Sequence, residues 1–184
     1  MRKILVYARK FSEYFHIPLH ILFGGLAAGI VIFKTDLYVY SHLLYAGVLG
    51  AILPDLEHFL FYYKTGAKCP YSSIVRSYIK KRKVKNLYSF MTKYHKGLSG
   101  LYLHNVFTPI LAVLFGAKYL DQGHYITSAF LFGVASHFIF DIMEDLLFFG
   151  KLNPNWYLKF TKEWHGVNDI PSEEELVKVG LRTG

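Results

Sequence analysis

Four long apolar segments constrain the fold of this chain more than any other feature. They are residues 17–33, 37–63, 98–117 and 125–149. A helix needs about 20 mainly apolar residues to cross a bilayer, and these segments are close to that length or exceed it. A soluble bundle with aromatic-rich core helices is the alternative, since 53% of the 184 residues are hydrophobic and 18% are aromatic. The clustering favours an all-α polytopic membrane protein, a bundle of four transmembrane helices.

The 21 lysines and arginines are distributed unevenly, and their distribution predicts an orientation. Nearly all of them precede the first apolar segment, lie in residues 64–96 or follow Gly150, and only Lys34 and Lys118 fall in the other two connections. Basic residues mark the cytoplasmic flanks of membrane helices. The pattern therefore predicts a multi-pass protein of the cell (inner) membrane with both termini in the cytoplasm.

The basic loop at 64–96 interleaves tyrosines with lysines. A nucleic-acid surface would also be basic and aromatic, but the neighbouring segments span the bilayer. We therefore expect this loop to contact anionic lipid headgroups, and we expect no nucleic acid as a partner. Its single Cys69 excludes an internal disulfide and an all-cysteine metal site. Residues 1–150 then form the membrane domain, and residues 151–184 form a cytoplasmic tail.

Ionisable residues inside the apolar segments gather toward the predicted cytoplasmic side. The stretch "GVASHFIFDIMEDLLFF" (133–149) contains a histidine and three carboxylates but no lysine or arginine. A buried acid costs about 2.5–3.5 kcal/mol even on a lenient insertion scale, so all the carboxylates in the segments would cost on the order of 10 kcal/mol. Protonation, a water-filled cavity or bound cations would relieve this cost. Bound cations explain the histidines and the acids together, because imidazole and carboxylate suit zinc, manganese and iron.

Spacing within the helices supports a metal site. Asp55 and His58 are three residues apart and His137 and Asp141 are four apart, so each pair shares a helix face. Glu144 returns to the stripe of His137 after seven residues. The predicted ligands of one to three divalent ions, with zinc foremost, are His20, Asp55, His58, His104, His137 and Asp141. Histidines at segment ends are interpreted as interfacial or solvent-facing: His16, His42, His124 and His165.

Around these residues the sequence resembles a family of inner-membrane metal-dependent hydrolases, described as LexA-binding, membrane-bound hydrolases. The motifs "LPDLEH" (53–58) and "GVASHFIFD" (133–141) carry the resemblance, and His20 matches the family's early histidine. In the third motif, "YHKGLSGLYLHN", the expected histidine is filled by His95, by His104 or by both. Two departures stand out: Glu57 replaces the usual aspartate and Glu144 replaces a common threonine.

The resemblance implies hydrolysis of a phosphoester, because the family is distantly similar to bacterial zinc-dependent phospholipases C. The expected substrate is a membrane lipid or a lipid-linked molecule, cleaved by metal-activated water. Glu144 or Glu57 would act as general base or orient a ligand histidine, and His95 and Lys96 would bind an anionic headgroup. Alternatives are a haem-binding membrane electron carrier, an ion or proton transporter that uses the buried acids, and a noncatalytic metal-stabilised scaffold.

Overall fold

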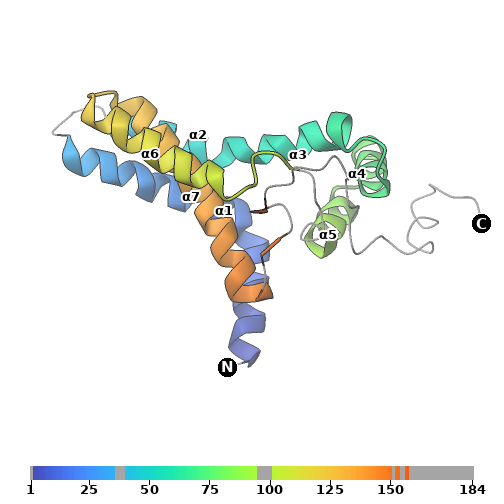
Figure 1. The fold of residues 1–184 in the computed structure, drawn as a ribbon. Coiled ribbons are helices and arrows are strands. Elements are labelled where there is room, and N and C mark those ends of the chain that lie inside the picture. The colour runs from blue at the N-terminus through green and yellow to red at the C-terminus, as the bar shows by residue number, and fades with distance from the viewer. Residues whose placement is uncertain (1, 36–39, 95–100, 151, 154–155, 158–184) are drawn as a thin grey trace, which may run out of the picture. The chain divides into compact units, whose positions relative to one another are not determined.

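The computed structural model describes residues 2–35, 40–94, 101–150, 152–153 and 156–157 (Figure 1). Every regular element among these residues is helical, which confirms the all-α class. The contacts divide the chain into two compact units. The first is formed by residues 1–56 and 103–152, and the second by residues 57–102 and 153–184.

Among the described residues, three helices are long and apolar enough to cross a membrane: Tyr14–Lys34, Tyr40–Thr65 and Tyr125–Phe148. They correspond to the first, second and fourth apolar segments of the sequence. This agreement supports a membrane protein. The second of these helices is not regular throughout, because α2 (Tyr40–Ile52) passes into a 3₁₀ turn, η1 (Leu53–Asp55), that contains Pro54. It then continues as α3 (Leu56–Leu60) and a wider turn, η2 (Phe61–Thr65).

The first unit consists of α2 with three further helices: α1 (Arg2–Lys34), α6 (Phe107–Asp121) and α7 (Tyr125–Glu144). Helices α1, α2 and α7 pack against one another, and α6 packs against α7. The C-terminal end of α1, the start of α2 and the α6–α7 turn lie at the same end of this unit (Figure 1). Buried residues from three of these helices form one core at that end: Ala28, Val31, Leu43, Ala46 and Ala129.

Glycines allow the three inner helices to approach closely. A Cβ atom on Gly47 of α2 would lie 2.5 Å from the carbonyl oxygen of Gly24 on α1. A Cβ atom on Gly133 of α7 would lie 2.1 Å from the carbonyl oxygen of Gly47. Backbone-to-backbone packing through small residues is typical of helix interfaces in membranes. The functional side chains of α1, α2 and α7 therefore project from helices that are held at short separation.

A kink divides α1 near its middle. Phe15 has non-helical dihedral angles (φ −100°, ψ 18°), three residues before Pro18. Proline lacks an N–H and its ring clashes with the preceding turn, so a helix kinks at this position. The kink lets the N-terminal part of α1 run beside the end of α7, where Ser12 contacts Glu144. Beyond Glu144, α7 widens into the turn η4 (Asp145–Phe149).

The predicted span 98–117 differs from the structure. Residues 101–106 are not helical, and α6 begins only at Phe107. The side-chain oxygen of Asn105 accepts the N–H groups of Phe107 at 2.9 Å and Thr108 at 3.1 Å, which caps this end of the helix. With 15 residues, α6 is about 22 Å long, shorter than a hydrocarbon core of about 30 Å. The prediction that His104 lies inside a helix is therefore wrong, and a fourth transmembrane span stays a prediction.

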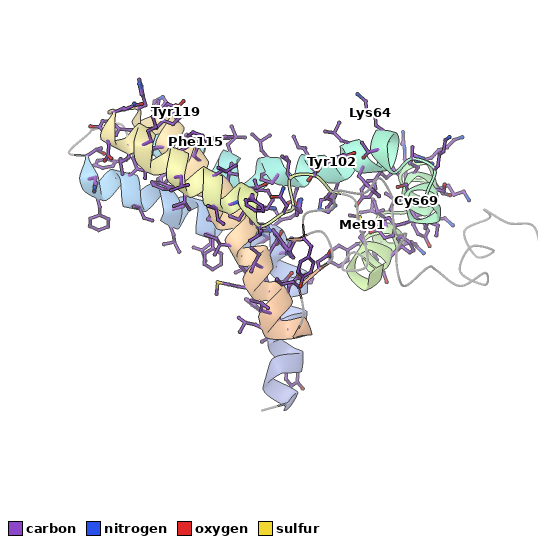
Figure 2. All side chains as sticks on the ribbon, viewed as in Figure 1. Lys64, Cys69, Met91, Tyr102, Phe115 and Tyr119 are labelled. Atoms are coloured by element: carbon purple, nitrogen blue, oxygen red, sulfur yellow. The ribbon has the colours of Figure 1, made fainter. Side chains whose placement is uncertain are left out.

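The second unit folds most of the predicted basic loop into a helical hairpin of α4 (Pro70–Lys80) and α5 (Val84–Tyr94). One core holds it together: Phe61, Tyr62, Tyr71, Ile74, Val75, Phe90 and Leu101. Cys69 and Met91, labelled in Figure 2, pack against that core. Arg76 donates hydrogen bonds to the carbonyl oxygens of Tyr62 and Ala67. This cation therefore links α4 to the backbone that precedes it and has a structural role within the unit.

Candidate metal site

One group of polar side chains gathers within the first unit, which the apolar helices largely bury. It contains residues from α1, from η1, from the chain before α6 and from α7. We call it the histidine–carboxylate cluster: His16, His20, Asp55, His104, His137, Asp141 and Glu144. Three subsets place their ligand atoms within 4.8 Å of one another, which suits a shared metal ion. These subsets are His16, His20 and Asp141; His20, Asp55 and His137; and His104, His137 and Asp141.

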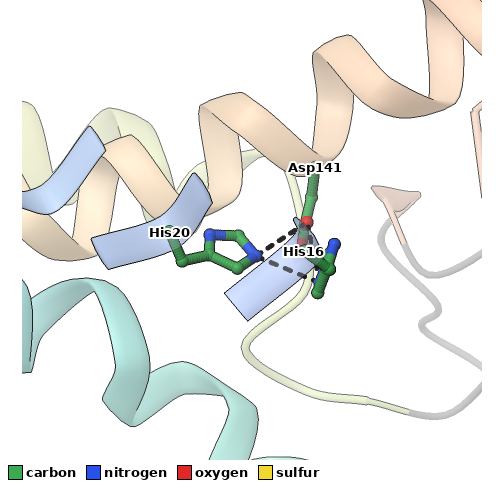
Figure 3. A group of neighbouring side chains, drawn as sticks. All are labelled: His16, His20 and Asp141. Atoms are coloured by element: carbon green, nitrogen blue, oxygen red, sulfur yellow. Dashed lines mark hydrogen bonds and ion pairs between the residues drawn. The ribbon is translucent and has the colours of Figure 1, made fainter. Parts of the chain in front are cut away.

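Asp141 lies at the centre of the cluster, and its two oxygens face different imidazole pairs. Its Oδ1 is 3.5 Å from His20 Nε2 and 3.9 Å from His16 Nε2 (Figure 3). Its Oδ2 is 3.4 Å from His137 Nε2 and 3.8 Å from His104 Nε2. Asp141 is therefore the residue that all four imidazoles share.

The orientation of His137 is fixed by the backbone of α2. Its Nδ1 lies 2.7 Å from the carbonyl oxygen of Ala51. A carbonyl oxygen can only accept a hydrogen bond, so Nδ1 carries the proton and Nε2 of the neutral ring presents a lone pair. That Nε2 lies 3.4 Å from Asp141 Oδ2 and 4.0 Å from Asp55 Oδ1. The His137 ring also stacks on His20, with centroids 4.0 Å apart and planes 20° apart.

His16 belongs to this cluster, although the sequence placed it at a helix end facing solvent or the interface. Its Nε2 lies 3.1 Å from His20 Nε2, and its Nδ1 lies 3.7 Å from Glu144 Oε1. The Ser12 hydroxyl donates to the same Glu144 oxygen at 2.6 Å. The signal that could have found His16 is its position four residues before His20, which puts both on one helix face.

The remaining predicted site residues belong to the second unit or lie outside the described residues. Glu57 and His58 belong to α3 and to the second unit. The Glu57 carboxylate is buried and accepts the backbone N–H of Tyr102, while His58 is half-buried. Their roles as base and ligand stay predictions. His95 and Lys96, predicted to bind substrate, lie outside the described residues.

The cluster fits a divalent metal ion in chemistry and in spacing. Ligands about 2.0–2.2 Å from a tetrahedral ion lie about 3.3–3.6 Å from one another, close to the separations around Asp141. The cluster includes buried atoms with no hydrogen-bond partner among the described residues, namely His20 Nδ1, His137 Nε2 and Asp141 Oδ1. The three candidate spans contain two lysines, Lys34 and Lys64, and both lie at the C-terminal end of a span. A cation bound here would therefore neutralise buried negative charge and bind the lone pairs of Asp141 Oδ1 and His137 Nε2.

Fold and site together define a class: a protein whose described elements are all helical, with helices long and apolar enough to span a membrane and a buried histidine–carboxylate cluster that could hold a metal ion. No family model, no curated protein and no solved structure matches this chain. The resemblance to the membrane-bound hydrolases therefore remains an expectation from the two sequence motifs.

Proposed function

We propose that this chain is a membrane-embedded, metal-dependent hydrolase that cleaves a phosphoester bond of a lipid or lipid-linked substrate. The observation that carries the proposal is the position of Asp141, whose oxygens face two imidazole pairs. It is supported by the burial of this site between helices that are apolar enough to span a membrane. A polar cluster of this kind in a membrane segment marks a functional site far more often than a structural one.

The arrangement favours two ion positions that share Asp141. His16 and His20 flank its Oδ1, while His104 and His137 flank its Oδ2. Two-metal hydrolytic sites place their ions about 3.5–4 Å apart, a distance that one carboxylate can bridge. We propose zinc as the resident ion, because imidazole-rich sites with carboxylates suit it well, with manganese or iron as alternatives.

A bound divalent ion would activate a water molecule and stabilise negative charge on a phosphoryl oxygen. The residues of the chain prepare that chemistry. Ala51 holds His137 with its Nε2 toward Asp141. Glu144 accepts the Ser12 hydroxyl and faces Nδ1 of His16, so we assign it the orientation of that imidazole rather than proton abstraction. The fold buries most of the cluster, namely His20, His104, His137, Asp141 and Glu144, and this burial would strengthen their electrostatic interactions.

The haem hypothesis receives less support from the geometry. A haem held by two histidines needs its planar ring between the two imidazoles. The rings of His20 and His137 stack directly, with centroids 4.0 Å apart, and Nε2 of His16 lies 3.1 Å from Nε2 of His20. Neither pair leaves room for a macrocycle between its rings, and Asp141 has no role in such a centre.

Metal analysis of the purified full chain tests the proposal. The parent protein should copurify with zinc, manganese or iron, and a His137→Ala, Asp141→Asn variant should lose most of it. His42→Ala is the matched control, because His42 is an exposed histidine of α2 outside the cluster. Equally low metal in the parent, the control and the double variant would refute the metal site.

The reaction itself needs a second assay. Proteoliposomes with the metal-loaded protein should hydrolyse at least one of a panel of phospholipid and polyprenyl phosphoesters, and the double variant should not. Metal without hydrolysis would point to the noncatalytic scaffold. Metal-dependent ion uptake into the same vesicles, lost in Asp55→Asn, would favour the transporter instead.

A further inference from the structure

A dense group of cations is exposed where the hairpin of the second unit turns. Residues 80–85 read Lys-Lys-Arg-Lys-Val-Lys, and all six are exposed. We call this segment the basic turn. The apolar faces of α4 and α5 point into their own core, so the hairpin presents its charged side outward. Arg76, by contrast, donates to backbone carbonyl groups within the unit and adds nothing to this surface.

The backbone of the basic turn places an arginine where glycine is usual. The N–H of Arg82 donates to Ile79 O at 3.0 Å and the N–H of Lys83 donates to Tyr78 O at 3.0 Å. This pair of bonds is a Schellman motif, which requires a left-handed residue after the helix. Arg82 occupies that position with φ 53°. Glycine adopts this conformation without the strain that an L-residue incurs. Arg82 at this position therefore costs conformational free energy that a glycine would not.

The cations of the basic turn have few carboxylates near them in the sequence. Between Glu57 and Asp121 the chain contains no aspartate or glutamate at all. Glu57 itself is buried and accepts the Tyr102 N–H. The basic turn itself carries five exposed cations in six residues, at positions 80–83 and 85. Such a concentration of positive charge fits an anionic partner.

We propose that the basic turn binds the anionic headgroup surface of the membrane in which the apolar helices are embedded. Two exposed hydrophobic side chains support lipid as the partner: Val84 is 71% exposed within the turn, and Tyr88 is 49% exposed one helical turn later. Apolar and tyrosine side chains beside cations favour the headgroup region, where the aromatic ring and the charges are both accommodated. Each cation near an anionic surface adds about fivefold to the binding equilibrium.

Chain connectivity favours lipid over nucleic acid. The candidate span Tyr40–Thr65 ends five residues before α4 begins at Pro70. Five extended residues reach at most about 18 Å, so the hairpin is tethered close to the end of a membrane helix. Tethering gives the membrane surface a high effective concentration at the basic turn, which a nucleic acid in solution does not have.

Energy transfer in lipid nanodiscs tests this proposal on the full chain. A fluorophore is attached at Asn86→Cys, an exposed position beside the basic turn, and acceptors are carried by the lipid headgroups. The background is Cys69→Ser, because serine can also accept the Ser72 N–H that Cys69 accepts at the start of α4. Transfer should be higher in discs with phosphatidylserine than in phosphatidylcholine discs. About 1 M salt should abolish the difference, since the Debye length is then only about 3 Å.

Charge variants separate binding from folding. Replacing the four lysines of the basic turn with glutamine should lower the ratio of headgroup-bound to unbound basic turn more than about tenfold. The helix content of the protein should stay unchanged. Arg82→Gly relieves the left-handed strain, so the hairpin should be as stable as in the parent or more stable. The loss of this cation should still weaken the binding of the basic turn to phosphatidylserine discs about fivefold. Arg82→Lys should respond like the parent. Lys118→Gln, at an exposed cation of α6, is the matched control and should also respond like the parent.

Several outcomes would overturn the proposal. Equal transfer in both lipid compositions would do so, and so would a parent-like response from the variant that lacks the four lysines. A third outcome is that the protein in phosphatidylcholine discs binds a labelled RNA oligonucleotide through the basic turn and that phosphatidylserine has no effect on the energy transfer. That result would assign the surface to nucleic acid. This experiment does not depend on the metal site or on hydrolysis.

Discussion

His137 donates its Nδ1–H to the carbonyl oxygen of Ala51 over 2.7 Å, which ties an imidazole of α7 to the backbone of α2. Ala51 lies just before the 3₁₀ turn at Pro54, where the regular hydrogen bonding of the helix changes. One consequence is that Nε2 of His137 faces Asp141 as a lone-pair donor. A second consequence is that the packing of α2 on α7 and the geometry of the site depend on each other.

The first prediction concerns metal removal. A metal that binds only the folded protein stabilises it by mass action, by about 2.7 kcal/mol when its free concentration is 100 times the Kd. Chelation should therefore lower the thermal unfolding midpoint of the detergent-solubilised protein by several degrees, and added metal should restore it. In Asp141→Asn the shift should largely disappear, because Asp141 is the residue shared by all four imidazoles.

The control for this prediction is His42→Ala, which should show the same metal-dependent shift as the parent. An unfolding midpoint that chelation leaves unchanged in the parent would contradict the prediction. So would an equal shift in the parent and in Asp141→Asn.

The second prediction concerns His16, which the linear sequence did not mark as a ligand. His16→Ala should remove one ion position and leave the position near His104 and His137, so the metal content should fall by about half. Ser12→Ala should keep both positions but weaken metal binding about 10–100-fold, because the Ser12 hydroxyl holds Glu144 in place. Titration with a competing chromophoric chelator measures both effects.

An exposed histidine provides the comparison for His16. His124, in the turn between α6 and α7, lies outside the cluster, and His124→Ala should keep the metal content of the parent. If His16→Ala also kept it, His16 would be excluded as a ligand.

The sequence predicted the features that depend on local pattern. The lengths of the apolar runs predicted the three candidate spans, because a helix that crosses a bilayer requires a long run of apolar residues. The spacing of His137 and Asp141, one helical turn apart, placed both in the same site. The expectation of a basic loop at residues 64–96 did not use a further pattern: Tyr71, Ile74, Val75 and Tyr78 recur at helical spacing, and most of them are buried. That amphipathic period is typical of a helix that packs one face against a core.

What the sequence did not predict depends on breaks in regular structure. The side chain of Asn105 caps the start of α6. This start was missed in the sequence because Asn105 lies within a long apolar run. The place of His16 depends on the kink at Phe15, since the bend brings the first part of α1 beside Glu144. Such contacts between segments far apart in sequence have no local signature. They arise only when the helices pack.

The third prediction tests the close packing of α2 and α7. Gly133→Ala should destabilise the protein by about 1–3 kcal/mol, because the new Cβ would lie 2.1 Å from the carbonyl oxygen of Gly47. Gly29→Ala is the matched control on α1, where a Cβ meets no atom within 4 Å. It should be neutral or stabilising by up to about 1 kcal/mol. Thermal unfolding in detergent compares the two, and equal stability would refute the close contact.

The fourth prediction concerns the orientation of the first unit in the membrane. The start of α2 and the α6–α7 turn lie at the same end of this unit, so Ser41 and Gln122 should be reached from the same side of the bilayer (Figure 1). In a Cys69→Ser background, Ser41→Cys and Gln122→Cys should react with a membrane-impermeant maleimide from that side alone. Both positions are exposed, so neither is shielded by packing.

The same experiment examines the positive-inside orientation. Because basic residues are concentrated away from both connections, the reactive side should be the one opposite the cytoplasm. Labelling of Ser41→Cys and Gln122→Cys from opposite sides would show that these helices do not cross the bilayer as the packed unit implies. Labelling of both from the cytoplasmic side would keep the helical unit but reverse the orientation, and the metal cluster would then lie in the opposite half of the membrane.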